Sequence, residues 1–138
     1  MVKVTVVGDT NAGKTTLVHK MVYGKLPDDP LLSTIGVDFH ILPAEHSVHI
    51  WDTGNLEKFG AIASQYYRRT NIFLIIYDCS NPVMACASLS KWHAHLKTRH
   101  SQYESGIPVY AIRTKSEIIG AVVPGIVQSY CENHGMVH

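Results

Sequence analysis

The residues with the clearest chemical meaning form the stretch GDTNAGKTT at positions 8 to 16. The stretch satisfies the Gly-x4-Gly-Lys-Thr pattern of a phosphate-binding loop. Gly8 and Gly13 permit backbone conformations that direct successive N–H groups inward. Lys14 brings a cation to the outer phosphates of a nucleotide, and Thr15 offers a hydroxyl to Mg²⁺. A glycine-rich turn without this role would explain neither the lysine nor the threonine. The predicted phosphate-binding residues are Asp9, Thr10, Asn11, Ala12, Gly13, Lys14, Thr15 and Thr16.

The segments around this loop alternate between strand-like and helix-like patterns, which predicts an α/β fold with a doubly wound, mostly parallel sheet. Strands are expected at 2–8, 37–42, 47–51, 72–78 and 107–114, and helices from residue 14 onwards, at 84–99 and at 124–133. The short polar connection between 37–42 and 47–51 predicts one antiparallel hairpin at the edge of the sheet. The unbroken apolar run 72–78 is typical of a strand that is covered on both faces. Residues 136–138 are expected to begin a further strand.

Four later segments resemble the Ras superfamily of small GTPases in their residues, order and spacing. They are STIGVDF at 33–39, IWDTG at 50–54, YYRRTNIFLIIYDCSNP at 66–82 and TKSE at 114–117. Three features are similar to the Rab branch: the segment IGVDF, the tryptophan before DTG and the YYR before the apolar strand. The resemblance implies a Rab-like switch that binds GTP or GDP with Mg²⁺ and serves vesicle trafficking.

Carried over to this sequence, the resemblance makes Thr15 and Thr34 the hydroxyl ligands of Mg²⁺, with Asp52 holding the ion through a water. Lys14 and Thr34 would also contribute to catalysis. Thr34 would reach the metal only when a γ-phosphate orders its loop. A turn residue before Gly36 is the alternative reading of Thr34.

The base would be bound after the strand 107–114, where the family has Asn-Lys-x-Asp and this sequence has Thr114, Lys115 and Glu117. The glutamate side chain is longer by one methylene, so it can contact guanine only if its loop lies slightly farther from the base. Leu26 stands where the family usually flanks guanine with an aromatic residue. We therefore expect a guanine preference that is weaker than usual, and a surface Lys/Glu pair is the alternative.

The stretch WDTGNLEKF at 51–59 departs from the family at two positions. The Rab-like pattern is Trp-Asp-Thr-Ala-Gly-Gln-Glu-Arg-Phe, so Asn55 takes the glycine position and Leu56 the glutamine position. Leucine can neither donate nor accept a hydrogen bond to the attacking water. The resemblance therefore implies slow hydrolysis of GTP.

Aromatic residues match the surface with which Rab-like proteins meet effectors and regulators, and they are Phe39, Trp51 and either Tyr66 or Tyr67. Each could instead belong mostly to the core. Ala85, Leu89, Trp92 and Leu96 follow a helical period and are expected to pack inward.

Composition limits the remaining possibilities. The chain has 138 residues, 46% of them hydrophobic, which predicts one domain over 1–138. A net charge of +1 without a dense basic run argues against a nucleic-acid partner. The three cysteines are odd in number, and neither they nor the nine histidines show the spacing of a metal-ligand motif. This argues against a disulfide framework and against a metal cluster. The N-terminus has no signal peptide, which predicts a cytoplasmic location.

The sequence stops before the last helix of the family and has no C-terminal cysteine for prenylation. We therefore expect no membrane anchor in this chain, and exposed apolar surface that favours self-association. Two other functions compete with the GTPase switch. One is a nucleotide-locked or nucleotide-free scaffold that binds effectors, and the other is a phosphotransferase, for which no acceptor site can be recognised.

Overall fold

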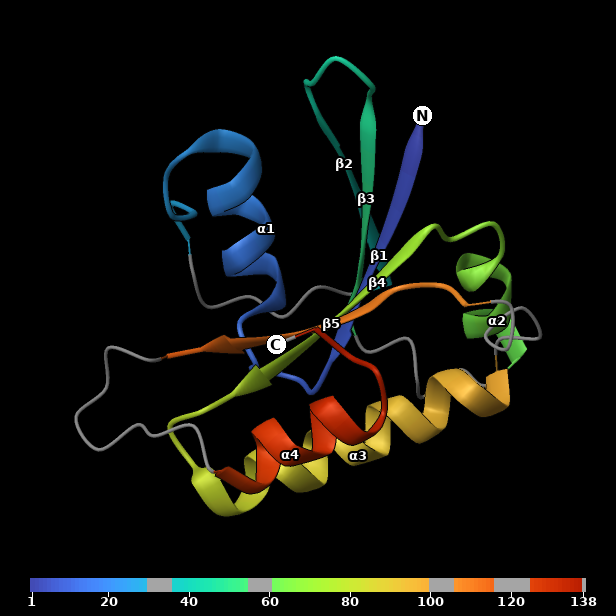
Figure 1. The fold of residues 1–138 in the computed structure, drawn as a ribbon. Helices are drawn as coiled ribbons and strands as arrows, with labels where there is room; N and C mark the ends of the chain where they lie inside the picture. Colours follow the sequence, from blue (N-terminus) through green and yellow to red (C-terminus); the bar gives the residue numbers. More distant parts are fainter. Residues whose placement is uncertain (30–35, 55–60, 100–105, 116–124, 138) are drawn as a thin grey trace.

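A computed structural model describes residues 1–29, 36–54, 61–99, 106–115 and 125–137. The chain forms a five-stranded sheet flanked by helices (Figure 1). The elements in chain order are β1 (Val2–Gly8), α1 (Lys14–Tyr23), β2 (Val37–Leu42), β3 (Val48–Thr53), α2 (Ala61–Tyr67), β4 (Ile72–Asp78), α3 (Pro82–Arg99), β5 (Val109–Thr114) and α4 (Gly125–Asn133).

The strand order is β2-β3-β1-β4-β5, and only the β2–β3 pair is antiparallel. The predicted doubly wound sheet with one edge hairpin is therefore confirmed. The apolar strands β1 and β4 lie next to each other in the interior of the sheet, because their side chains are buried on both faces.

Two hydrophobic clusters divide the core. Alternate residues of β4, among them Phe73 and Ile75, pack with α2, α3 and α4 on one face of the sheet. The intervening residues, such as Ile76, pack with α1 on the other face. Figure 1 shows this layering, with α1 on one side of the sheet and α3 beside α4 on the other.

The stripe that the helical period predicts in α3 is confirmed. Ala85, Leu89, Trp92 and Leu96 are all 1% exposed or less. The stripe places Trp92 in the same cluster as β4, which fixes α3 against the sheet.

Several boundaries differ from the expectation. β3 continues to Thr53, so Asp52 lies within the strand and not after it, because β3 pairs with β2 as far as Val37. The helix α2 was not predicted, since its seven residues are too few for a clear helical period. Val137 forms only an isolated bridge to Tyr110 and no strand.

No helix follows α4 up to residue 137. None of the described helices is long and apolar enough to cross a membrane.

Candidate nucleotide-binding site

The phosphate loop lies between the end of β1 and the start of α1, as the pattern predicts. Gly8 has φ +152°, and a Cβ built there would lie 2.3 Å from the carbonyl oxygen of Ile76 on the neighbouring strand. Gly13, at the N-cap of α1, has a left-handed conformation with φ +93°. The loop therefore needs glycine at Gly8 for space, and at Gly13 for its backbone conformation.

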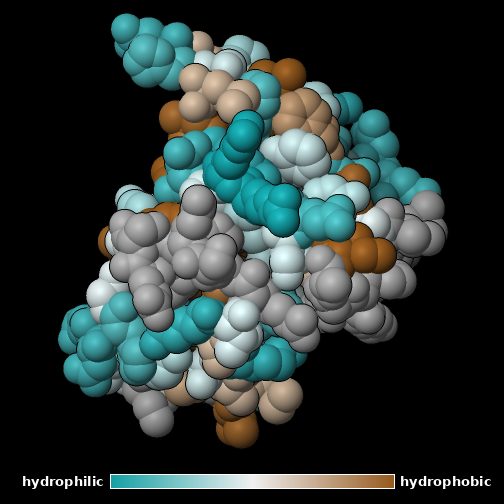
Figure 2. Space-filling view, turned by 90° about the vertical axis from the view of Figure 1, so that its right-hand side faces the viewer, coloured by the Kyte–Doolittle hydropathy of each residue, from teal (hydrophilic) through white to brown (hydrophobic). Residues whose placement is uncertain are grey.

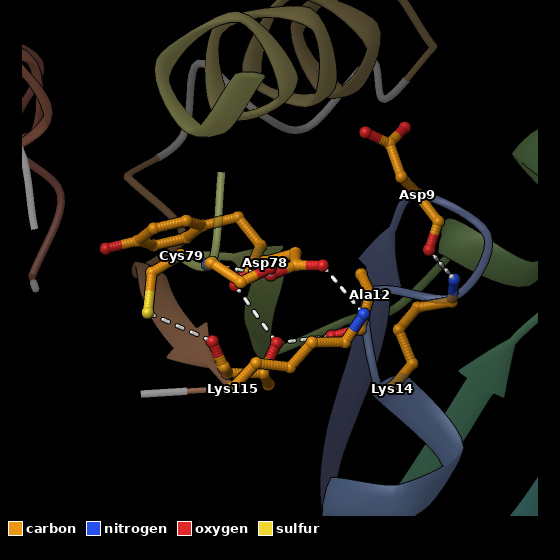
Figure 3. Close-up of polar contacts among 9 residues, drawn as sticks. Asp9, Ala12, Lys14, Asp78, Cys79 and Lys115 are labelled. Atoms are coloured by element: carbon orange, nitrogen blue, oxygen red, sulfur yellow. Dashed lines mark hydrogen bonds and ion pairs between the residues drawn. The ribbon is translucent and has the colours of Figure 1, made fainter. Parts of the chain in front are cut away.

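Lys14 is held at the mouth of this loop. Its ammonium donates hydrogen bonds of 2.8 Å to the carbonyl oxygens of Gly8 and Asp9, and the side chain is buried. Figure 3 shows the bond from Lys14 to Asp9. The N–H of Ala12 donates to the same carbonyl of Asp9 at 3.0 Å, which closes the turn. The first N–H groups of α1 and the lysine charge thus lie together, and this is the combination that binds phosphate.

Thr15 and Asp52 are brought together from α1 and β3. The Thr15 hydroxyl donates a 2.5 Å hydrogen bond to Oδ2 of Asp52, which is fully buried. Burial raises the pKa of Asp52, with hydrogen bonding from Thr15 and the charge of Lys14 acting against it. The other oxygen, Oδ1, is buried and accepts no hydrogen bond from the described part of the chain. A hydroxyl next to a buried carboxylate with an unsatisfied oxygen fits the ligand chemistry of Mg²⁺.

Thr114 and Lys115 continue the site from β5. The Thr114 hydroxyl donates to the carbonyl oxygen of Ala12 in the phosphate loop and, at 3.1 Å, to that of Tyr77. The Lys115 ammonium forms a 2.7 Å ion pair with Asp78 at the end of β4 (Figure 3). Thr114 therefore connects the segment that is predicted to bind the base to the phosphate loop.

Sequence reasoning assigned no role to Asp78, although an acidic residue at the end of a buried strand was a usable signal. Its carboxylate also accepts hydrogen bonds from the Ser80 N–H at 2.8 Å and the Ser80 hydroxyl. Partial burial acts to raise the pKa of Asp78, but the hydrogen bonds from Lys115 and Ser80 hold it below its usual value. The ion pair with Asp78 thus holds the Lys115 side chain in its orientation.

A hollow of about 230 Å³ lies between the phosphate loop, the start of α3 and Lys115. Its lining includes Thr10, Asn11, Asp78, Asn81 and Met84. The hollow borders both the predicted phosphate residues and the predicted base residues. Of the predicted site residues, Thr34, Leu56 and Glu117 lie outside the described residues.

Comparison with known proteins agrees with this geometry. Residues 3–117 match the family model of Roc, the Ras of Complex domain of DAPkinase. The chain belongs to the Ras superfamily of small GTPases, as a divergent Rab-like member. It is 32% identical to the Ras-related protein RABA2a of Arabidopsis thaliana over 97% of this chain and 63% of the relative. It is 34% identical to human Rab-36 over 85% of this chain and 44% of the relative. It is 26% identical to Rab-32D of Dictyostelium discoideum over 96% of this chain and 61% of the relative. The chain thus spans less than two thirds of the length of these relatives.

The aromatic residues of this Rab-like chain that were predicted to meet effectors divide into two groups. Phe39, Trp51 and Tyr66 form a row, with ring centroids 5.0 Å and 6.0 Å apart, and Phe39 is 45% exposed. Tyr67 is fully buried against Phe73, so its assignment to a contact surface is wrong for this conformation. Its hydroxyl is hydrogen-bonded to His95 of α3 instead.

Lys3 supports this aromatic row from β1. Its ammonium lies 4.9 Å from the ring centroid of Trp51 and donates to the carbonyl oxygens of Tyr66 and Arg68 at the end of α2. Figure 2 views the molecule from the side on which α2 lies, where the coloured hydrophobic residues form small separate patches. Among the coloured residues on this side there is thus no broad hydrophobic face.

Proposed function

We propose that this Rab-like chain is a molecular switch that binds GTP and GDP with Mg²⁺ at the phosphate loop. The observation that carries the proposal is the meeting of Lys14, Thr15 and Asp52 at one end of the sheet. Lys14 would bind the outer phosphates, together with N–H groups at the start of α1. Thr15 would be a ligand of Mg²⁺ and Asp52 would orient it through water, with Thr34 as the second hydroxyl ligand. The bound ion would neutralise charge on the β- and γ-phosphates.

We further propose that hydrolysis of GTP is slow. Leu56 stands where the family has the glutamine that orients the attacking water, and its side chain has no polar atom. The loss of one such preorganised group typically costs about 10² to 10³ in rate. The protein would then remain in the triphosphate state unless a partner supplies the missing group.

The alternative is a nucleotide-locked or nucleotide-free pseudo-GTPase that acts as a binding scaffold for effectors. Two observations favour it: Glu117 replaces the aspartate of the base signature, and Leu26, at the position that flanks guanine, is 60% exposed. In either case the aromatic row Phe39, Trp51 and Tyr66 would be the contact surface for effectors and regulators. A cytoplasmic location and self-association stay predictions.

Calorimetric titration with GTP, GDP and ATP, in Mg²⁺ and in EDTA, tests the proposal. Guanine nucleotide binding in the submicromolar range that weakens in EDTA and in Lys14→Ala supports the switch. Absence of binding to any of the three supports the scaffold, and a preference for ATP supports a phosphotransferase. Lys25→Ala is the matched control, because this exposed lysine lies beyond α1 and pairs only with Asp28 among the described residues.

A further inference from the structure

The side chain of Asp9 ties the phosphate loop to α3. Its Oδ2 accepts a 2.5 Å hydrogen bond from the Ser88 hydroxyl, and its Oδ1 accepts one of 3.1 Å from the indole N–H of Trp92. The Lys91 ammonium pairs with the same Oδ1. Lys91 and Trp92 follow Ser88 by three and four residues, about one helical turn, so both lie near Ser88 on the surface of α3. One carboxylate of the loop thus collects three donors from a single helix.

Two of these donors, Ser88 and Trp92, are buried, whereas Lys91 is exposed. Ser88 is 8% exposed and Trp92 is 1% exposed, and Trp92 belongs to the core cluster under the sheet. A buried indole N–H needs an acceptor, because leaving it unsatisfied is costly. Partial burial acts to raise the pKa of Asp9, but the hydrogen bonds from Lys91, Ser88 and Trp92 lower it below its usual value. The ionised carboxylate therefore fits this position.

The backbone of the same residue holds the nucleotide-binding lysine. The carbonyl oxygen of Asp9 accepts from the Lys14 ammonium at 2.8 Å and from the Ala12 N–H at 3.0 Å. One residue thus contacts both α3, through its side chain, and the Lys14 ammonium, through its backbone oxygen. Figure 3 shows the carboxylate of Asp9 directed away from the loop, on the opposite side of the residue from its bond to Lys14.

We infer that Asp9 is a positioning residue: its side chain fixes the phosphate loop to α3 while its backbone oxygen holds Lys14, so that nucleotide affinity depends on the position of α3. The inference rests on the proposed nucleotide binding and adds a route to its regulation. A partner that shifts α3 would change nucleotide affinity, and nucleotide would change the environment of Trp92, because coupling between two sites is reciprocal.

The dissociation constant of Mg·GDP is measured for the wild type and four variants. Asp9→Ala removes the acceptor of all three donors, and we expect affinity to fall about tenfold. Asp9→Asn keeps one oxygen acceptor for Trp92 or Ser88, so it should recover part of the loss. Ser88→Ala removes one donor and should give a smaller loss. Asp28→Ala is the matched control, since Asp28 is an exposed aspartate with a lysine partner, and it should bind as the wild type does.

The indole N–H resonances provide a readout that simple destabilisation would not produce. The chain has two tryptophans, and Trp92→Phe assigns the resonance of Trp92. We expect Mg·GDP to shift this resonance in the wild type, and to shift it much less in Asp9→Asn at nucleotide saturation. Thermal unfolding of each variant identifies any that does not fold. If Asp9→Ala does not fold, Asp9→Asn and Ser88→Ala decide the question.

Two results would overturn the inference while leaving the proposed function intact. One is nucleotide binding by Asp9→Asn and Ser88→Ala at wild-type affinity, and the other is a Trp92 resonance that Mg·GDP leaves unmoved. A wild type that binds no nucleotide would overturn both the proposed function and the inference that rests on it.

Discussion

The hydroxyl of Thr15 at the start of α1 lies 2.5 Å from the carboxylate of Asp52 near the end of β3. This pair joins the helix that follows the phosphate loop to a strand from the middle of the chain. The second oxygen of Asp52 is buried and accepts no hydrogen bond from the described residues, which supports the Mg²⁺ site that we propose here.

Asp52→Asn is expected to separate metal binding from stability. The variant should weaken Mg²⁺-dependent GDP affinity about 10- to 100-fold, because it removes the charge that holds the ion. In EDTA its GDP affinity should equal that of the wild type, and the metal-free protein should unfold at a higher temperature, because burial already disfavours the ionised carboxylate. Calorimetry and thermal unfolding measure the two effects. Equal Mg²⁺ dependence in both proteins would contradict the assigned role.

Leu56→Gln is expected to accelerate single-turnover hydrolysis of GTP by about 10² to 10³. The substitution restores a side chain that can orient the attacking water. Rapid-quench measurement of released phosphate gives the rate, and Leu56→Met is the control for side-chain size without a hydrogen-bonding amide. A wild type as fast as ordinary small GTPases, or a variant no faster than the wild type, would show that this interpretation of the second switch is wrong.

Gly8→Ala is expected to destabilise the protein by about 3 kcal/mol. A Cβ there would lie 2.3 Å from a backbone oxygen of β4, which cannot move without breaking the strand pairing. Gly24→Ala is the matched control, because Gly24 also has a positive φ, at +72°, but nothing lies within 4 Å of its added Cβ. It should cost only about 1 kcal/mol. Urea unfolding measures both values, and equal losses would remove the steric argument.

His93 is expected to make stability depend on pH. Burial, followed by the charges of Lys97 and His134, lowers the pKa of His93 to about 4. The unfolded chain therefore binds the proton more tightly than the native state, so the free energy of unfolding decreases as pH falls from about 6.5 to about 4. The loss should be about 3 kcal/mol.

The control for this effect is His46, which is exposed in the turn after β2. His93→Gln should reduce the slope of stability against pH in that window, and His46→Gln should leave the slope unchanged. Urea unfolding at a series of pH values measures the slopes. An unchanged slope in His93→Gln would contradict the prediction.

The sequence predicted the sheet well because its strands are defined by local patterns. The β-branched run before Gly8 and the apolar run around Ile75 could each be recognised alone, and Gly13 and Lys14 marked the loop between strand and helix. The same patterns could not fix the end of β3, because its last two residues, Asp52 and Thr53, are polar. Their place in the strand depends on pairing with β2, which only the folded sheet specifies.

Contacts between distant residues were the main feature that the sequence did not predict. The bonds from Ser88 and Trp92 to Asp9 span 79 and 83 positions, and the pair of Lys115 with Asp78 spans 37. No local period indicates such contacts. The burial of Tyr67, beside the partly exposed Tyr66, likewise depends on how α2 packs. A seven-residue helix gives too little pattern to decide which of two adjacent tyrosines turns inward.

The order of strands in the sheet also has a consequence for synthesis on the ribosome. Of the five strands, β1 is synthesised first but lies between β3 and β4, so its backbone has no strand neighbour until residue 53 has been made and lacks its second neighbour until residue 78. At usual elongation rates the interval between residues 8 and 78 is roughly 4 to 14 s. During this time β1 has at most β3 as a strand partner, and its apolar residues lack the core that the residues of β4 complete. We therefore expect the nascent chain to depend on chaperones until β4 emerges, and a ribosome stalled before β4 to hold an aggregation-prone chain.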